Sequence, residues 1–232
     1  MKYYEINMNL ISLEVFHLEK GGNCTLNLYV IRHGQSTMNI GKGGGADCEL
    51  SEIGYWQAQQ IPTYFKDIKV KVIFSSPLRR ALLSALPLAR ACNLPVILVP
   101  EMSEMFLDQW TEYRDYNWLR CDQIESDYDN VRFIHTHDKS KQWWPVWPED
   151  QRAVRARVRS FYDRHIAPEL GTDENIVVVG HGQSTADLKQ IANPGDMIPV
   201  YNAGIVKFTM RADGKCESAE VFTEHLGIHV SD

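Results

Sequence analysis

The chain has 232 residues, of which 44% are hydrophobic and 23% are charged. This is long and apolar enough to bury one sizeable core, and a charged fraction near the globular average excludes wholesale disorder. The net charge of −6 argues against nucleic acid as a partner, because phosphate backbones select basic surfaces.

The cysteines and the N-terminus bear on the cellular compartment. Five scattered cysteines without a CxxC pair predict reduced thiols rather than disulfides or a zinc site. Polar residues interrupt any apolar signal core near the N-terminus, and no apolar run approaches the length of a membrane span. We therefore expect a soluble, cytoplasmic protein without membrane partners, and leave a homo-oligomer open.

The predicted elements alternate along the chain. Residues 1–24 fit either an extra edge strand or a loosely held extension. After them, runs of strand length and composition occupy 25–31, 69–74, 95–99, 176–179, 204–210 and 218–223. Apolar residues at helical spacing, with start signals before them, occupy 51–62, 78–89 and 154–166.

This alternation predicts the fold class. Strands that alternate with helices form βαβ units and a sheet covered on both faces. We therefore predict an α/β, three-layer sandwich with a central, mostly parallel sheet. No linker-like stretch interrupts residues 25–232, so we expect a single domain. Residues 111–150 lack a clear period and are expected to form a lid-like insertion over one end of the sheet.

Two histidines stand in matching places. His33 follows an apolar strand-like run, His181 follows another, and Gly-Gln-Ser comes after each. In an open α/β sheet, ligands bind beyond the carboxyl ends of the strands. Both imidazoles are therefore expected at the binding edge, where the following glycines let backbone N–H groups approach an anion.

Two arginines complete the predicted pocket. Arg32 precedes His33, and Arg80 comes just after another predicted strand. Guanidinium groups give bidentate contacts to phosphate oxygens and keep their charge at any working pH. Because phosphoryl transfer needs mainly positioning and charge stabilisation, these residue types predict a site for a tetrahedral phosphate dianion.

The order of the motifs resembles the histidine phosphatase superfamily, also called phosphoglycerate-mutase-like. The resemblance covers roughly residues 25–223. It rests on residues 32–39 (RHGQSTMN), 50–54 with 57–58, 75–81, Glu104 with Trp110, 180–182 and 202–204.

The resemblance implies a reaction and its residues. It makes His33 the nucleophile that becomes phosphorylated and Glu104 the proton donor in hydrolysis of a phosphate monoester. By the same likeness, the phosphoryl oxygens are held by Arg32, Asn39, Arg80, His181 and Gly182. No cofactor and no metal are expected, and the partner is expected to be a small phosphorylated metabolite.

Alternatives stay open on the activity and on the acid. A phosphoglycerate mutase shares the same pocket, and a catalytically silent phospho-ligand-binding protein would need no nucleophile. Mutases of the cofactor-dependent kind carry further basic and tyrosine motifs after the acid, which residues 105–125 lack. Glu101 and Glu112 lie near Glu104 in sequence and compete for the role of acid.

The aromatic residues of the insertion offer two interpretations. They either pack the insertion against the domain or face the substrate as apolar walls. The residues considered for this substrate lid are Trp118, Trp143, Trp144 and Trp147.

Overall fold

The computed structural model describes residues 24–227, so the predicted edge strand or extension at residues 1–24 lies almost wholly outside the described residues. Within them, the backbone forms one seven-stranded sheet in the order β4-β3-β2-β5-β1-β6-β7. The strands are β1 (Thr25–Arg32), β2 (Val72–Ser75), β3 (Val96–Leu98), β4 (Val131–Phe133), β5 (Asn175–Gly180), β6 (Ile205–Arg211) and β7 (Cys216–Phe222).

The sheet is mostly parallel, as predicted. Strands β1 to β5 run in one direction, with β5 inserted between β1 and β2. Strand β6 runs opposite to the other six strands and forms a hairpin with β7. The carboxyl ends of β1, β2 and β5 therefore meet at one edge, where residues that follow these strands come together.

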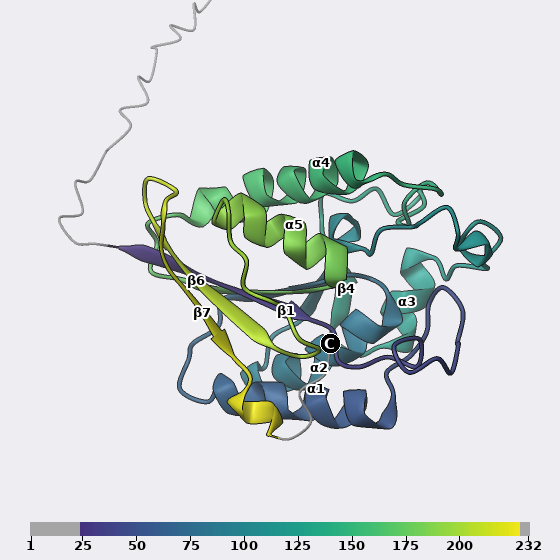
Figure 1. The fold of residues 1–232 in the computed structure, drawn as a ribbon, viewed down its shortest axis with the longest axis horizontal. Helices are drawn as coiled ribbons and strands as arrows, with labels where there is room; N and C mark the ends of the chain where they lie inside the picture. The colour runs from purple at the N-terminus through teal and green to yellow at the C-terminus, as the bar shows by residue number, and fades with distance from the viewer. Residues whose placement is uncertain (1–23, 228–232) are drawn as a thin grey trace, which may run out of the picture.

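Helices cover both faces of the sheet and make three layers (Figure 1). Helices α1 (Glu52–Tyr64) and α2 (Arg79–Cys92) lie on one face, and α4 (Gln151–Phe161) and α5 (Gly182–Ala192) lie on the other. The remaining helix, α3 (Cys121–Asp127), packs on the α2 side.

Alternating side chains of the central strands fill the two cores. In β1, Tyr29 and Ile31 pack with α1 and α2, whereas Leu28 and Val30 pack with α4 and α5. Successive side chains of a strand point to opposite faces, so a strand buried on both sides reads as a continuous apolar run. This is why 25–31 and 176–179 are recognisable from sequence.

Helix starts follow local capping. The Ser51 side chain accepts a hydrogen bond from the Gly54 N–H at the start of α1, and Asp150 accepts one from Ala153 at the start of α4. Such caps satisfy backbone donors that a helix leaves open. The predicted 154–166 helix is α4 followed by a π-helical turn at Tyr162–Ile166.

The range 111–150 differs from the predicted lid-like insertion. It contains α3 and supplies β4, which pairs in parallel with β3 and forms one edge of the sheet. Its aromatic side chains belong to the core that α1 and α2 also cover. This segment is therefore integrated into the fold, and not merely laid over one end of the sheet.

No helix within residues 24–227 is both long and apolar enough to span a bilayer.

Candidate active site

The two histidines are neighbours at the carboxyl edge of the sheet. Strands β1 and β5 pair in parallel with Arg32 opposite Gly180, so His33 and His181 leave the sheet at equivalent positions. Their ring centroids are 5.1 Å apart. The side chains are almost completely buried, at 4% exposure for His33 and 0% for His181. The predicted pairing of the two imidazoles is therefore present in the structure.

The local geometry of His33 favours one neutral tautomer. Its Nδ1 lies 2.7 Å from the carbonyl oxygen of Gly34, so Nδ1 carries the proton and Nε2 carries the lone pair. Burial, and then the charge of Arg80, hold the pKa of His33 well below its usual range. His33 is thus an uncharged base with Nε2 available to an electrophile.

Tight backbone packing fixes the turn after His33. A Cβ on Gly34 would come within 2.7 Å of the Gly54 carbonyl oxygen, so only glycine fits against the start of α1. The Gly34 N–H donates to Ser84 Oγ at 2.8 Å. These contacts hold the carbonyl group that orients the His33 ring.

Asn202 and Ala203 hold His33 from the other side. Asn202 Nδ2 donates to the His33 carbonyl oxygen at 2.9 Å, and Ala203 N–H lies 3.2 Å from the same oxygen. Ala203 adopts a φ of 55°, in the left-handed region that non-glycine residues rarely occupy. The motif at 202–204 was recognisable in sequence, but its role in holding the backbone of His33 was not.

His181 makes its ring contact with Ser76. The imidazole Nε2 is 2.8 Å from Ser76 Oγ, and both residues are fully buried. Burial, followed by the charges of Arg80 and His33, holds the pKa of His181 well below its usual range. His181 is therefore also neutral at physiological pH. Ser76, which lies in the sequence motif at 75–81 but was given no role in the site, is therefore part of it.

Arg80 and Arg32 supply the positive charge beside the histidines. Arg80 is buried and donates to the Ala46 carbonyl oxygen at 3.2 Å, while Arg32 donates to the Val200 carbonyl oxygen at 3.2 Å. The charges of both guanidinium groups lower the pKa of His33, with Arg80 the stronger of the two. A buried, charged arginine beside two neutral imidazoles is suited to an anionic ligand.

Tyr113 is a further neighbour of Arg80 that sequence reasoning missed. Its side chain is buried against Phe106 and Trp110. Burial raises the pKa of Tyr113 to about 12, with Arg80 acting in the opposite direction. A single tyrosine in an aperiodic segment carries no sequence signal that would connect it with an arginine more than thirty residues away.

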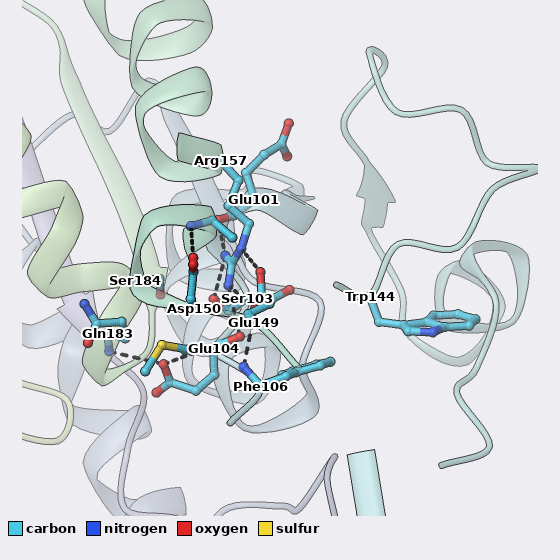
Figure 2. A network of polar contacts seen from close by, with 12 residues as sticks. Glu101, Ser103, Glu104, Phe106, Trp144, Glu149, Asp150, Arg157, Gln183 and Ser184 are labelled. Carbon is cyan, nitrogen blue, oxygen red and sulfur yellow. Dashed lines mark hydrogen bonds and ion pairs between the residues drawn. The ribbon is translucent and has the colours of Figure 1, made fainter. Parts of the chain in front are cut away.

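Of the two glutamates that follow β3, Glu104 points toward Gln183 at the start of α5, and Glu101 points away from it (Figure 2). Glu104 Oε1 accepts hydrogen bonds from Met105 N–H at 2.8 Å and from Gln183 N–H at 3.2 Å, at the first turn of α5. The Glu101 carboxylate is instead paired with Arg164 at 2.5 Å. Glu112 is exposed in a short 3-10 turn, Thr111–Tyr113.

The remaining predicted anion ligands lie at the same edge or near it. Gly182 begins α5, and a Cβ there would lie 3.5 Å from Glu104 Oε2. Asn39 is exposed in the loop after His33, where its Oδ1 accepts from the backbone and the hydroxyl of Ser36 at 2.9 and 2.8 Å. Its phosphate contact therefore stays a prediction.

The four tryptophans are mainly packing residues. Trp118 and Trp143 are buried and in edge-to-face contact, and the Trp143 indole N–H donates to the Leu119 carbonyl oxygen at 2.8 Å. Trp144 stacks on Trp118, and Figure 2 places it well to one side of Glu104. The Trp147 indole N–H donates to the Leu107 carbonyl oxygen at 2.9 Å. Burial thus favours the packing interpretation over a substrate lid for Trp118 and Trp143.

Sequence relatives are phosphatases and mutases. A family model of the histidine phosphatase superfamily, branch 1, matches residues 28–215. The chain is 32% identical over 169 residues to a glucosyl-3-phosphoglycerate phosphatase of Mycobacterium tuberculosis, covering 69% of this chain and 72% of that protein. It is 27% identical over 215 residues to a 2,3-bisphosphoglycerate-dependent phosphoglycerate mutase of Rhizobium meliloti, covering 87% and 98%.

Solved structures agree with this assignment. A mycobacterial glucosyl-3-phosphoglycerate phosphatase solved with VO3 superimposes with a TM-score of 0.59 at 25% identity, covering 85% of this chain and 97% of that one. A structure titled mycobacterial hydrolase 1 shares the fold, with a TM-score of 0.60 at 24% identity over 86% and 97%. The matching family model, together with the two histidines and their glycines at adjacent strand ends, places this chain in the histidine phosphatase superfamily, branch 1.

Proposed function

We propose that the protein hydrolyses phosphate monoesters through a phosphohistidine intermediate on His33. The observation that carries this proposal is the state of the His33 ring, which is buried, neutral and held through Nδ1 by the Gly34 carbonyl. That arrangement directs the lone pair of Nε2 away from the backbone and toward the open edge of the sheet, where parallel strands bind ligands.

The reaction proceeds in two displacements. In the first, His33 Nε2 forms a bond to phosphorus while the bond from phosphorus to the ester oxygen breaks. Arg32 and Arg80 balance the charge of the phosphoryl oxygens, and neutral His181 adds a hydrogen-bonding group. In the second, water attacks phosphorus, the P–N bond breaks and inorganic phosphate leaves with His33 restored.

Glu104 is the proposed proton donor. Its carboxyl group is oriented by Met105 and Gln183 N–H groups, which both bond Oε1 and leave Oε2 on the side of Gly182. Protonated Glu104 passes its proton to the departing ester oxygen, and the resulting carboxylate then accepts a proton from the attacking water. Glu101 is unsuited to this role because its carboxylate is held by Arg164.

The proposed substrate is a small phosphorylated metabolite. Relatives that act on such compounds support this class, among them an adenosylcobalamin/alpha-ribazole phosphatase of Escherichia coli at 30% identity over 161 residues. The second candidate function is phosphoglycerate mutase activity, favoured by the likeness to the mutase of Rhizobium meliloti over 98% of its length. A silent binding protein is disfavoured because binding requires neither the nucleophile nor the acid.

A substrate panel in isotopic water separates hydrolysis from mutase activity. The purified protein is incubated with phosphorylated metabolites, including 3-phosphoglycerate, in water enriched in oxygen-18. Hydrolysis releases inorganic phosphate that carries one heavy oxygen, because water attacks the phosphohistidine. Mutase activity would instead return an isomeric phosphate ester without that label, and absence of both products across the panel would contradict the proposal.

A further inference from the structure

Arg157 lies on α4, and every N–H group of its guanidinium donates a hydrogen bond (Figure 2). The acceptors lie on the segment 101–104, which carries Glu104, and on Glu149 in the loop just before α4. The Arg157 side chain is 15% exposed, and that of Glu149 is 6% exposed. Arg157 Nε donates to Glu149 Oε1 (2.9 Å), and Nη2 donates to Glu149 Oε2 (3.0 Å) and to the Glu104 carbonyl oxygen (3.0 Å). Arg157 Nη1 donates to the carbonyl oxygens of Glu101 (2.6 Å) and Ser103 (2.8 Å).

Two of these contacts fix the backbone on both sides of Glu104. The Ser103 carbonyl belongs to the peptide group before the Glu104 Cα, and the Glu104 carbonyl belongs to the one after it. Because Arg157 bonds both oxygens, it restrains both soft dihedral angles of Glu104. The direction in which the Glu104 side chain leaves the backbone follows from those angles.

Glu149 also links α4 to the segment that carries Glu104. Its carboxylate pairs with Arg157, and its Oε2 also accepts the Phe106 N–H at 3.3 Å. Its own N–H donates to the Phe106 carbonyl oxygen at 2.8 Å. The pair therefore ties the segment 101–106 to the start of α4 and leaves the carboxyl of Glu104 facing Gln183 on the other side.

We propose that Arg157 is a positioning residue for the Glu104 carboxyl, acting through the backbone that it holds on both sides of that residue. This inference rests on the proposed role of Glu104 as proton donor. A lysine at 157 supplies one nitrogen in place of three, so it cannot reproduce the planar set of contacts. None of the five hydrogen bonds of Arg157 goes to His33 or His181, although its charge is among those that lower the pKa of His181.

Leaving-group dependence distinguishes positioning from a purely structural role. Since kcat/KM reports the steps up to departure of the leaving group, it is measured for an alkyl phosphate and for p-nitrophenyl phosphate, whose leaving group departs without a proton. Misplacing a catalytic group by about 1 Å costs on the order of 100-fold. The kcat/KM of Arg157→Ala is therefore expected to fall by about that factor on the alkyl ester and by distinctly less on p-nitrophenyl phosphate. The kcat/KM of Arg157→Lys is expected to lie between those of wild type and Arg157→Ala.

A matched control lies two residues away on the same helix. Arg155 is exposed, so Arg155→Ala removes the same charge from α4 without touching the Glu104 segment. This variant is expected to keep wild-type kcat/KM on both esters. Equal losses in Arg155→Ala and Arg157→Ala would assign the effect to helix charge and overturn the inference.

Chemical rescue addresses a variant that folds poorly. Arg157 lines a cleft of about 550 Å³ together with Asp108, Val146, Pro148 and Ala153, so a guanidinium ion can reach the space that Arg157→Ala vacates. Millimolar guanidinium is expected to restore alkyl-ester hydrolysis in Arg157→Ala and to leave Arg155→Ala unchanged. Equal losses on both esters without rescue would overturn the inference.

Glu104→Gln, assayed in parallel, separates this inference from the proposed function. Where Glu104→Gln shows the leaving-group dependence and Arg157→Ala does not, the positioning role is wrong and the proposed function stands. Where Glu104→Gln itself shows no such dependence, the acid assignment fails, and the positioning role fails with it.

Discussion

Ser76 Oγ lies 2.8 Å from His181 Nε2, and both side chains are fully buried. Ser76 stands directly after β2, and its hydroxyl also accepts the Leu78 N–H at 3.2 Å. The serine is thereby fixed by the start of the following helix and in turn holds the second imidazole. Strands β2 and β5 are paired, so this contact joins two strand ends at the candidate site.

Ser76→Ala should weaken catalysis moderately. Its hydroxyl orients His181, and a hydrogen bond between neutral groups contributes about 0.5–1.5 kcal/mol, or roughly 2–10-fold in rate. We expect kcat/KM to fall by that factor, with His181→Ala falling further. Steady-state kinetics of both variants check this, and a Ser76→Ala protein as active as wild type would show that His181 needs no such support.

Glu104→Gln should slow alkyl phosphate hydrolysis by about 10²–10⁴-fold, because general acid catalysis is typically worth that much. Glu101→Gln is the matched control, since its carboxylate pairs with Arg164. It should keep nearly full activity. A large loss in Glu101→Gln, with Glu104→Gln close to wild type, would reverse the assignment of the acid.

The two neutral histidines predict how stability changes with pH. The folded-state pKa values of His33 and His181 lie well below the unfolded value, mainly through burial and then Arg80. Between the folded and unfolded values, the unfolded chain binds more protons, so the free energy of unfolding decreases as pH falls below about 6.5. Each histidine contributes a slope of at most about 1.4 kcal/mol per pH unit.

His33→Gln isolates one of these contributions. Urea unfolding of wild type and variant between neutral pH and pH about 5 should give a shallower decline for His33→Gln, because one of the histidines whose pKa burial lowers is gone. Parallel curves for the two proteins would mean that His33 is protonated equally in the folded and unfolded states.

The packing of the tryptophans predicts that their removal lowers stability and leaves selectivity between bulky and small esters unchanged. Trp143 is 3% exposed and bonded to Leu119, so Trp143→Ala should cost about 3–5 kcal/mol of unfolding free energy. It should reduce kcat/KM equally for bulky and small esters. Denaturant unfolding and paired kinetics check this, and a selective loss on bulky esters at unchanged stability would restore the lid interpretation.

Much of the sheet could be predicted from the sequence because its central strands are buried on both faces. Residues 28–31 and 176–179 are continuously apolar. The helix at 78–89 carries a start signal and apolar periodicity, and the helix at 51–62 carries a start signal. The placement of His33 and His181 followed from the same logic, since both stand directly after such runs.

Elements without those signals were missed. Helix α5 buries polar side chains such as Ser184, Asp187 and Lys189, so its sequence shows no clean apolar stripe. Strand β4 has only three residues, with exposed Arg132 in the middle. The contacts of Arg157 and Tyr113 depend on tertiary packing between distant segments, which sequence spacing does not reveal.

Covalent labelling of His33 is the most direct test of the phosphohistidine mechanism. Enzyme is mixed with a phosphate monoester labelled in the phosphoryl group, quenched within the first turnover, and digested for peptide mapping. A phosphohistidine intermediate predicts acid-labile, base-stable phosphate on the peptide containing His33, and none in His33→Ala. Phosphate that is acid-stable, that maps to another peptide, or that persists in His33→Ala would contradict the phosphohistidine mechanism.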